Sequence, residues 1–266
     1  MVETQPAKPT GGFRRRRLIF GGLAVAGLVA AVVFHGALLR WFVSPLLVAP
    51  PTIDDVDVIW LRSDNGTSPC GDGAIDAAVV VLRKNPKADI VVTQAFPSRL
   101  VQIGAVPPLE TTVRRELSRR GVPGGRVSAL ESRPGGLWYE TERVCAYLQN
   151  KPGIAQRDSA HVLLIGEEFA GAATALQVRR ARAAASAGRP EDRTKPRWEF
   201  SVWGVRDRRF APNTWWKSRD GVKACMFGWL NLIYTALHGG PPPEIRRLAP
   251  EDFEDFYLRR FGKADG

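Results

Sequence analysis

The sequence contains few of the residues and motifs on which metal and cofactor enzymes depend. Its 266 residues include three cysteines and three histidines, and no C-x-x-C pair or Cys/His cluster has the spacing of metal ligands. The motifs G-x-G-x-x-G, G-x-x-x-x-G-K-[ST], G-x-S-x-G and H-E-x-x-H are also absent. None of the motifs that mark these common catalytic and nucleotide-binding sites is therefore available to identify a site, and no metal ligand set is evident. We therefore expect neither a metal nor a cofactor.

Cysteine is too scarce to form a disulfide framework. The three cysteines, Cys70, Cys145 and Cys225, cannot all pair within one chain. Cys145 and Cys225 fall within helical patterns, which predicts that both are small core residues. The sequence leaves open whether Cys70 or Cys145 takes part in a disulfide.

Lysine is scarce relative to arginine, and the positive charge is not massed in one place. The net charge is +11, but residues 1–40 carry almost half of it, with six basic residues against Glu3. The remainder is spread along the chain, whereas nucleic-acid binding calls for a concentrated basic patch. Nucleic acid is therefore not an expected partner, and anionic lipid headgroups or acidic glycans fit the charge better.

The most informative segment joins four arginines, Arg14 to Arg17, to an apolar run from Leu18 to Leu39 whose one strongly polar side chain is His35. About 20 apolar residues in a helix span the hydrocarbon core of a bilayer. Flanking arginines favour the cytoplasmic side. This pattern predicts a cytoplasmic basic tail (1–17), a single transmembrane anchor (18–39) and a main domain outside the cytoplasm at the inner membrane.

Three other interpretations of this segment remain open. A cleaved signal peptide has a shorter apolar core and a small-x-small site, which the following residues HGALLRWFVSPLL do not offer cleanly. Arg15 and Arg16 also loosely match a twin-arginine export signal. A buried core helix is the least favoured, because nothing upstream would cover it.

After a proline-containing linker (40–55), β-branched runs alternate with amphipathic patterns through residues 56–238. This alternation predicts a Rossmann-like, doubly wound α/β domain with a mostly parallel sheet of about five strands. A C-terminal tail (239–266) has a short helix at 250–261. The predicted strands are 56–62, 89–94, 126–130, 161–166 and 198–205, and the predicted helices are 73–84, 107–120, 139–149, 170–187 and 219–237.

For two of these elements the sequence also predicts how deeply they are buried. The all-apolar run Val162 to Ile165 is typical of a central parallel strand buried on both faces. The last helix, 219–237, is apolar enough to raise a second membrane span as an alternative. It contains Lys223 and Asn231 and is short for a span, so a packed core helix is favoured.

The order and spacing of these elements resemble the YdcF/SanA/ElyC family of bacterial proteins, whose function is largely unknown and several of whose members carry one N-terminal anchor. The resemblance covers roughly residues 54–238 and implies a role in cell-envelope biology. It rests on DVIWLRSDN, DIVVTQ, ETTVRRELSRRGVPGGRV, the pair Glu131-Ser132, Glu140, VLLIG and WWKSRDGVKACMFGWLNLIY.

The sequence also departs from the family pattern. The family has a Ser or Thr, a His and an Arg after its fourth strand, where this chain has GEEFAGAATAL. A family acidic residue in the last helix corresponds here to Gly228. These departures put in doubt any chemistry that the family's cleft performs.

The carboxyl ends of the predicted strands supply the candidate ligand-binding residues, because doubly wound sheets bind ligands at that edge. Glu110 and Glu140 lie near helix starts facing the same edge and are added to the set. For each glutamate, simple complementation of a helix dipole or a solvated loop charge is the competing interpretation. The strand-end candidates are Arg62, Asp64, Asn65, Thr93, Gln94, Glu131, Ser132, Glu167 and Glu168.

Two functions follow from these residues. In the first, Arg62 and the backbone N–H groups at the helix starts hold an anionic small molecule or glycan, so that the protein binds or processes a phosphorylated or glycan envelope intermediate. In the second, the domain is a non-catalytic envelope module that has lost the family's site. A cleft filled by Trp138 or Phe96 would favour the second, and the sequence leaves catalysis undecided.

Overall fold

The structure is a computed structural model, and it describes residues 27, 29, 33–62, 72–95, 101, 103–105, 107–132, 136–157, 159–186, 197–242, 244, 245, 248, 252 and 256. The chain divides into two compact units, Met1–Ser44 and Pro45–Gly266. In the first unit, residues 33–43 are helical, and the Ser44 hydroxyl donates to the carbonyl of Trp41 at 2.8 Å. The second unit is the α/β domain.

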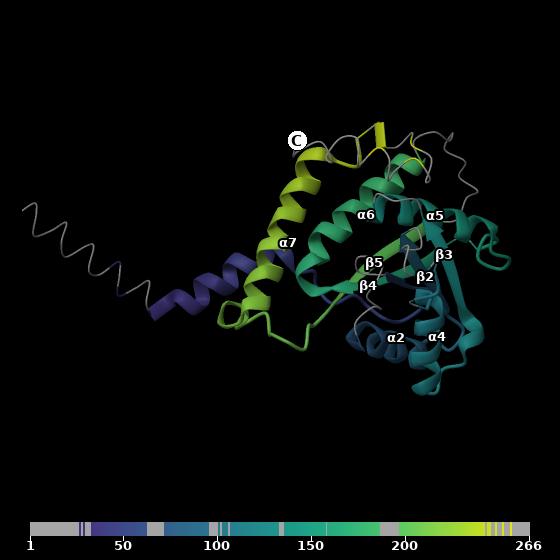
Figure 1. The fold of residues 1–266 in the computed structure, drawn as a ribbon, viewed down its shortest axis with the longest axis horizontal. Coiled ribbons are helices and arrows are strands. Elements are labelled where there is room, and N and C mark those ends of the chain that lie inside the picture. The colour runs from purple at the N-terminus through teal and green to yellow at the C-terminus, as the bar shows by residue number, and fades with distance from the viewer. Residues whose placement is uncertain are drawn as a thin grey trace, which may run out of the picture. The chain divides into compact units, whose positions relative to one another are not determined.

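Five parallel strands form one sheet in the order β3-β2-β1-β4-β5, which confirms the predicted α/β class (Figure 1). The strands are β1 Val58–Arg62, β2 Asp89–Ala95, β3 Val127–Ser132, β4 Ser159–Glu167 and β5 Arg197–Val205. The α-helices are α2 Asp72–Lys84, α4 Leu109–Arg119, α5 Leu137–Asn150, α6 Gly171–Ser186 and α7 Arg219–His238, and the short 3-10 helices are η1 Ser44–Leu46, η2 Gly124–Arg126, η3 Glu168–Ala170 and η4 Trp215–Lys217. Each strand and α-helix lies within a few residues of its predicted range.

Alternation of side chains along the strands builds two hydrophobic cores, one on each face of the sheet. On one face, Ile59 and Leu61 of β1 pack with α2 and α4. On the other, Val58 and Trp60 pack with residues of α5 and α6. The β4 run Val162–Ile165 is buried on both faces, as the sequence predicted. The helices cover the sheet from both sides, which is the doubly wound arrangement (Figure 1).

The segment before β1 belongs to the α/β unit and is not a free linker. Leu46 is fully buried, and Val48 packs so closely on Gly171 that a Cβ on that glycine would lie 2.9 Å from Val48 Cγ2. Further along, the Asn85 side chain donates to the Ile53 carbonyl at 2.7 Å. The compact unit therefore begins at Pro45, well before the predicted boundary at residue 56.

Helix α7 corrects the prediction of a packed core helix. Its main neighbours are α6, η3 and η4, so it lies outside the two layers that cover the sheet. Ser218 caps its start by accepting the Gly221 N–H at 2.9 Å, and Gly239 ends it with a left-handed φ of 71°. One face of α7 is buried, and the other exposes large apolar side chains. The sequence pattern could not show this, because a helix apolar on both faces predicts burial on both.

The predicted membrane anchor falls mostly outside the described residues. Of 18–39, the structure describes residues 27, 29 and 33–39. Within the part of the chain that is described, no helix combines the length and apolar character needed to cross a membrane. The predicted short helix at 250–261 is described only at residues 252 and 256.

The two cysteines predicted to lie in the core do so. Cys145 and Cys225 are both buried, and burial raises the pKa of the Cys225 thiol. Cys70 lies outside the described residues.

Candidate functional site

A buried polar network joins the carboxyl end of β1 to the first turn of α5. The Arg62 guanidinium forms a two-point ion pair with Glu140, with Nε 2.8 Å from Oε2 and Nη2 3.0 Å from Oε1. The Thr93 hydroxyl donates to Glu140 Oε2 at 2.6 Å and accepts from the Trp60 indole N–H at 2.7 Å. Glu140 thus accepts three hydrogen bonds, two of them from a cation.

The local structure explains why these side chains meet. Arg62 and Thr93 are register partners on adjacent strands β1 and β2, so their side chains leave the sheet on the same face. Trp60 lies two residues before Arg62 and shares that face. Glu140 follows Gly136, whose φ of 78° suits glycine at the start of α5. The network thus depends on the sheet register and on the position of one helix start.

Burying the Glu140 carboxylate costs free energy that its hydrogen-bond partners must offset. The Glu140 side chain is 4% exposed, whereas Arg62 is 24% exposed. A buried carboxylate without a partner costs several kcal/mol, and a two-point arginine contact together with a hydroxyl donor offsets that cost. Arg62 is therefore the more accessible member of the pair, held in place by an anion below it.

Arg62 lies at the topological switch of the sheet. The strand order reverses between β1 and β4, and open α/β sheets bind ligands outside the carboxyl ends of the strands at such a point. On the other side of the switch, β4 ends at Glu167 and η3 begins at Glu168. Burial raises the pKa of Glu168, and the nearby positive charge of Arg206 partly opposes that effect. The switch is therefore flanked by one arginine and one partly desolvated carboxyl group.

Four candidates taken from strand ends lie within strands. Thr93 and Gln94 are in β2, inside its predicted range 89–94, whereas Glu131 and Ser132 end β3, which runs past its predicted end at residue 130. Gln94 pairs with Glu131 in the register, so alternation directs both away from the face that holds Thr93 and Glu140. Ser132 is buried, and its hydroxyl donates to the Gln94 carbonyl at 3.4 Å. The predicted residues do not all share one face.

Glu110 forms an ion pair within α4 and does not join the Arg62 network. It accepts a hydrogen bond from Arg114 one turn along α4, at 2.7 Å, and Arg114 also donates to the Val127 carbonyl at the start of β3. This ion pair supports the structural interpretation of Glu110. Glu167 is exposed at the end of β4. Asp64, Asn65 and Phe96 lie outside the described residues.

Trp138 does not fill the region around Arg62. It is buried in a small cluster with Tyr139 and Ala181, between α5 and α6, and its indole N–H donates to Glu142 at 2.9 Å. Trp138 therefore gives no support to a cleft closed by aromatic side chains.

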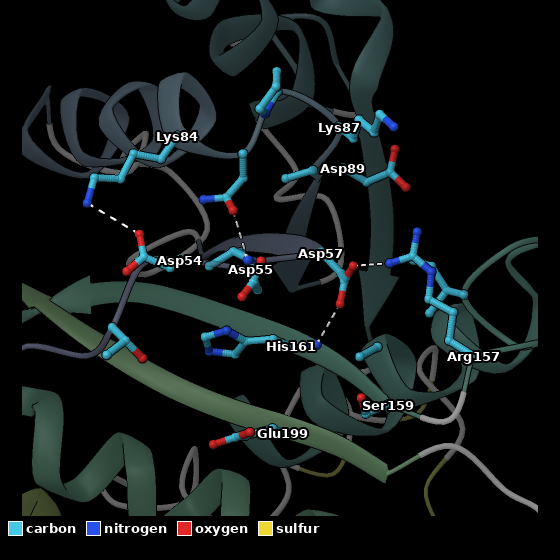
Figure 2. Close-up of a pocket in the computed structure, with 17 residues that line it drawn as sticks. Asp54, Asp55, Asp57, Lys84, Lys87, Asp89, Arg157, Ser159, His161 and Glu199 are labelled. Carbon is cyan, nitrogen blue, oxygen red and sulfur yellow. Dashed lines mark hydrogen bonds and ion pairs between the residues drawn. The ribbon is translucent and has the colours of Figure 1, made fainter.

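A hollow at the opposite, amino edge of the sheet was not foreseen from the sequence. It measures about 750 Å³ and is lined mainly by polar side chains that lie just before or at the starts of β1, β2 and β4, together with Glu199 of β5 (Figure 2). Asp54, Asp55 and Asp57 just before β1 are the sequence signal that marks it. Sequence reasoning passed over this trio because ligand sites in such sheets lie at the other edge.

The charged groups of this hollow bond one another and the strand starts. Asp57 pairs with Arg157 and accepts the His161 backbone N–H at 2.9 Å, and Figure 2 shows both contacts from the one carboxylate. Asp54 lies 3.4 Å from the Lys84 ammonium group. Asp57 thus ties the starts of β1 and β4 together. These contacts favour a structural role for the amino edge.

Within the described residues, no group of three or more His, Cys, Asp or Glu side chains is placed to hold a metal ion. No family model, no curated protein and no solved structure matches the chain.

Proposed function

We propose that this protein is a membrane-anchored α/β protein of the cell envelope that binds a phosphorylated or glycan intermediate at the carboxyl edge of its sheet. The observation that carries the proposal is the Arg62–Glu140–Thr93 network at the topological switch. Arginine suits phosphate oxygens because its planar fork donates parallel hydrogen bonds. The resemblance to the YdcF/SanA/ElyC family supports the envelope setting.

Glu140 has the role of a positioning residue in this proposal. Its two oxygens accept from Arg62 and Thr93, and its side chain is almost fully buried. A general base must instead reach the proton that it removes from the substrate. The geometry of Glu140 therefore supports binding over proton transfer by this residue.

A non-catalytic envelope module is the second candidate. Three features favour it: the engagement of Glu140, the pairing of Glu110 with Arg114, and the GEEFAGAATAL segment in place of the family's His and Arg. In this candidate the network stabilises the fold and holds no ligand.

A thermal-shift series separates the two candidates. The full-length protein in detergent micelles is titrated with a nucleotide-sugar, a short-chain polyprenyl phosphate and a neutral oligosaccharide. A phosphorylated ligand is expected to raise the unfolding midpoint, because a ligand that binds only the native state stabilises it by mass action. Arg62→Lys is expected to weaken that ligand about tenfold, since a charge-assisted hydrogen bond contributes roughly 1.5–3 kcal/mol.

Arg157→Lys is the matched control, because Arg157 forms its ion pair at the opposite edge of the sheet. It is expected to leave the ligand affinity unchanged. If no ligand raises the midpoint of the wild-type protein, the non-catalytic module becomes the better description.

The proposed location is the inner membrane, with the N-terminus in the cytoplasm and the α/β domain outside. A reporter active only outside the cytoplasm is expected to work when fused after Gly266. Replacing Arg14 to Arg17 with glutamine is expected to reduce that activity, because flanking positive charge sets orientation. Activity of a cytoplasmic reporter alone at Gly266 would show that the proposed orientation is wrong.

A further inference from the structure

Helix α7 carries an exposed apolar stripe along most of its length. Its large apolar side chains, 49–75% exposed, recur at intervals that place them on one face. The opposite face, which includes Cys225 and Thr235, is buried. A soluble monomer seldom leaves so continuous an apolar surface open to water. The stripe consists of Met226, Phe227, Leu230, Ile233, Tyr234 and Leu237.

Two basic side chains lie on the face of the stripe. Arg219 and Lys223 are exposed and fall on the same helical face, at its N-terminal end. Asp220 lies to the side of the stripe, 3.6 Å from Arg209. An apolar face with basic residues beside it is typical of a helix that lies in a membrane interface and meets anionic headgroups.

The face of α7 opposite the stripe is held by the α/β unit. Gly228 at the middle of α7 is buried, and a Cβ there would lie 3.0 Å from Leu46 Cδ1 and 2.5 Å from the Phe169 carbonyl oxygen. Leu46 and the Phe169 carbonyl therefore pack against the buried face of α7, and the domain leaves only the stripe open.

We propose that α7 lies in the headgroup region of the bilayer, with its apolar stripe facing the acyl chains and Arg219 and Lys223 among anionic headgroups. The proposal rests on the membrane anchoring proposed above. It requires no second span, because the opposite face of α7 is buried against the domain.

The position of α7 at the lipid surface also narrows the class of ligand proposed for the carboxyl edge of the sheet. Phe169 lies in η3, two residues beyond the end of β4, and its carbonyl contacts α7 at Gly228. The carboxyl edge of the sheet, at β4, therefore lies beside the helix that meets the lipid. A site at this edge is suited to a lipid-linked phosphate held at the membrane surface.

Spin labels on the full-length protein test the proposal. Single cysteines are introduced at Leu230 and Tyr234 in a Cys70→Ser background, and the protein is reconstituted into vesicles of phosphatidylcholine and phosphatidylglycerol. Both labels are expected to gain collisions with oxygen and lose collisions with a water-soluble nickel chelate. A label at Val80, exposed on α2 across the sheet, is the control and should keep full contact with the chelate.

A fourth label, at Val33, reports on the anchor independently. Oxygen contact at Val33 together with chelate contact at Leu230 would overturn the α7 proposal and leave the anchor standing. Chelate contact at both positions would overturn both proposals. Loss of contact with both reagents at Leu230, with spin–spin broadening, would show that a second copy covers the stripe. Loss of contact with both reagents at Leu230 without spin–spin broadening would show that another segment of the same chain covers the stripe. Either result overturns the lipid proposal.

Discussion

Replacing Leu164 with aspartate is expected to unfold the α/β unit. Leu164 is fully buried in the interior strand β4, where its neighbours are Trp60 on β1 and Val202 on β5. A carboxylate there has no partner, and an isolated buried charge costs upward of about 4–5 kcal/mol, a large share of a typical domain's stability. The measurement is circular dichroism and thermal melting of the purified variant.

Val80→Asp is the control for this experiment. Val80 lies on α2 and is 44% exposed, so the new carboxylate stays in water. It is expected to melt close to the wild type. A cooperative melt of Leu164→Asp near the wild-type midpoint would contradict the burial of β4 on both faces.

The second large effect is expected at the Arg62–Glu140 pair. Arg62→Met leaves the Glu140 carboxylate buried without its cation, and breaking a buried pair on one side costs about 3–5 kcal/mol, less where one partner is partly exposed. Glu140→Gln alone is also destabilising. The double variant is expected to lose less stability than the two single variants added together, with a coupling of about 1–2 kcal/mol. Chemical denaturation of all four proteins measures this coupling.

The exposed pair Lys84 and Asp54 provides the matched control. Its side chains are 54% and 71% exposed, and an exposed ion pair adds little to stability. The cycle of Lys84→Met and Asp54→Asn is expected to show coupling near zero. Equal coupling in the two cycles would mean that the Arg62 network contributes no more than a surface contact.

The strands and sheet helices were predictable because their patterns are local. The run Val162–Ile165 needs apolar cover on both faces, so its central position followed from the sequence alone. The helices that cover the sheet alternate with the strands, which dictates a parallel order. The strand ends were less certain, since Glu131 and Ser132 carry polar side chains yet continue β3.

The candidate site was only partly predictable, because its contacts are not local. Arg62 and Glu140 were both singled out, but their ion pair joins positions 78 residues apart. No spacing in the sequence shows that Thr93 and Trp60 complete the network. The direction of the Glu131 side chain depended on where β3 ends, and strand ends are where sequence patterns are weakest.

The last helix was misjudged for a related physical reason. Its buried face is formed by small residues, and Gly228 allows the Phe169 carbonyl to approach closely. Any side chain at position 228 would collide with that carbonyl. Large apolar residues also occupy the opposite face of α7, and periodicity alone cannot show whether such a face is buried in a core.

The central position of β1 affects how the protein is made. The first strand to emerge during synthesis pairs on one side with β4, and 104 residues separate Asp57 from its partner His161. Until β4 emerges, one edge of β1, which is apolar from Val58 to Leu61, has no neighbour, and unpaired strand edges are prone to aggregate. Folding of the sheet therefore cannot finish until β4 has been synthesised, and a chain cut short before His161 would be a target for proteolysis.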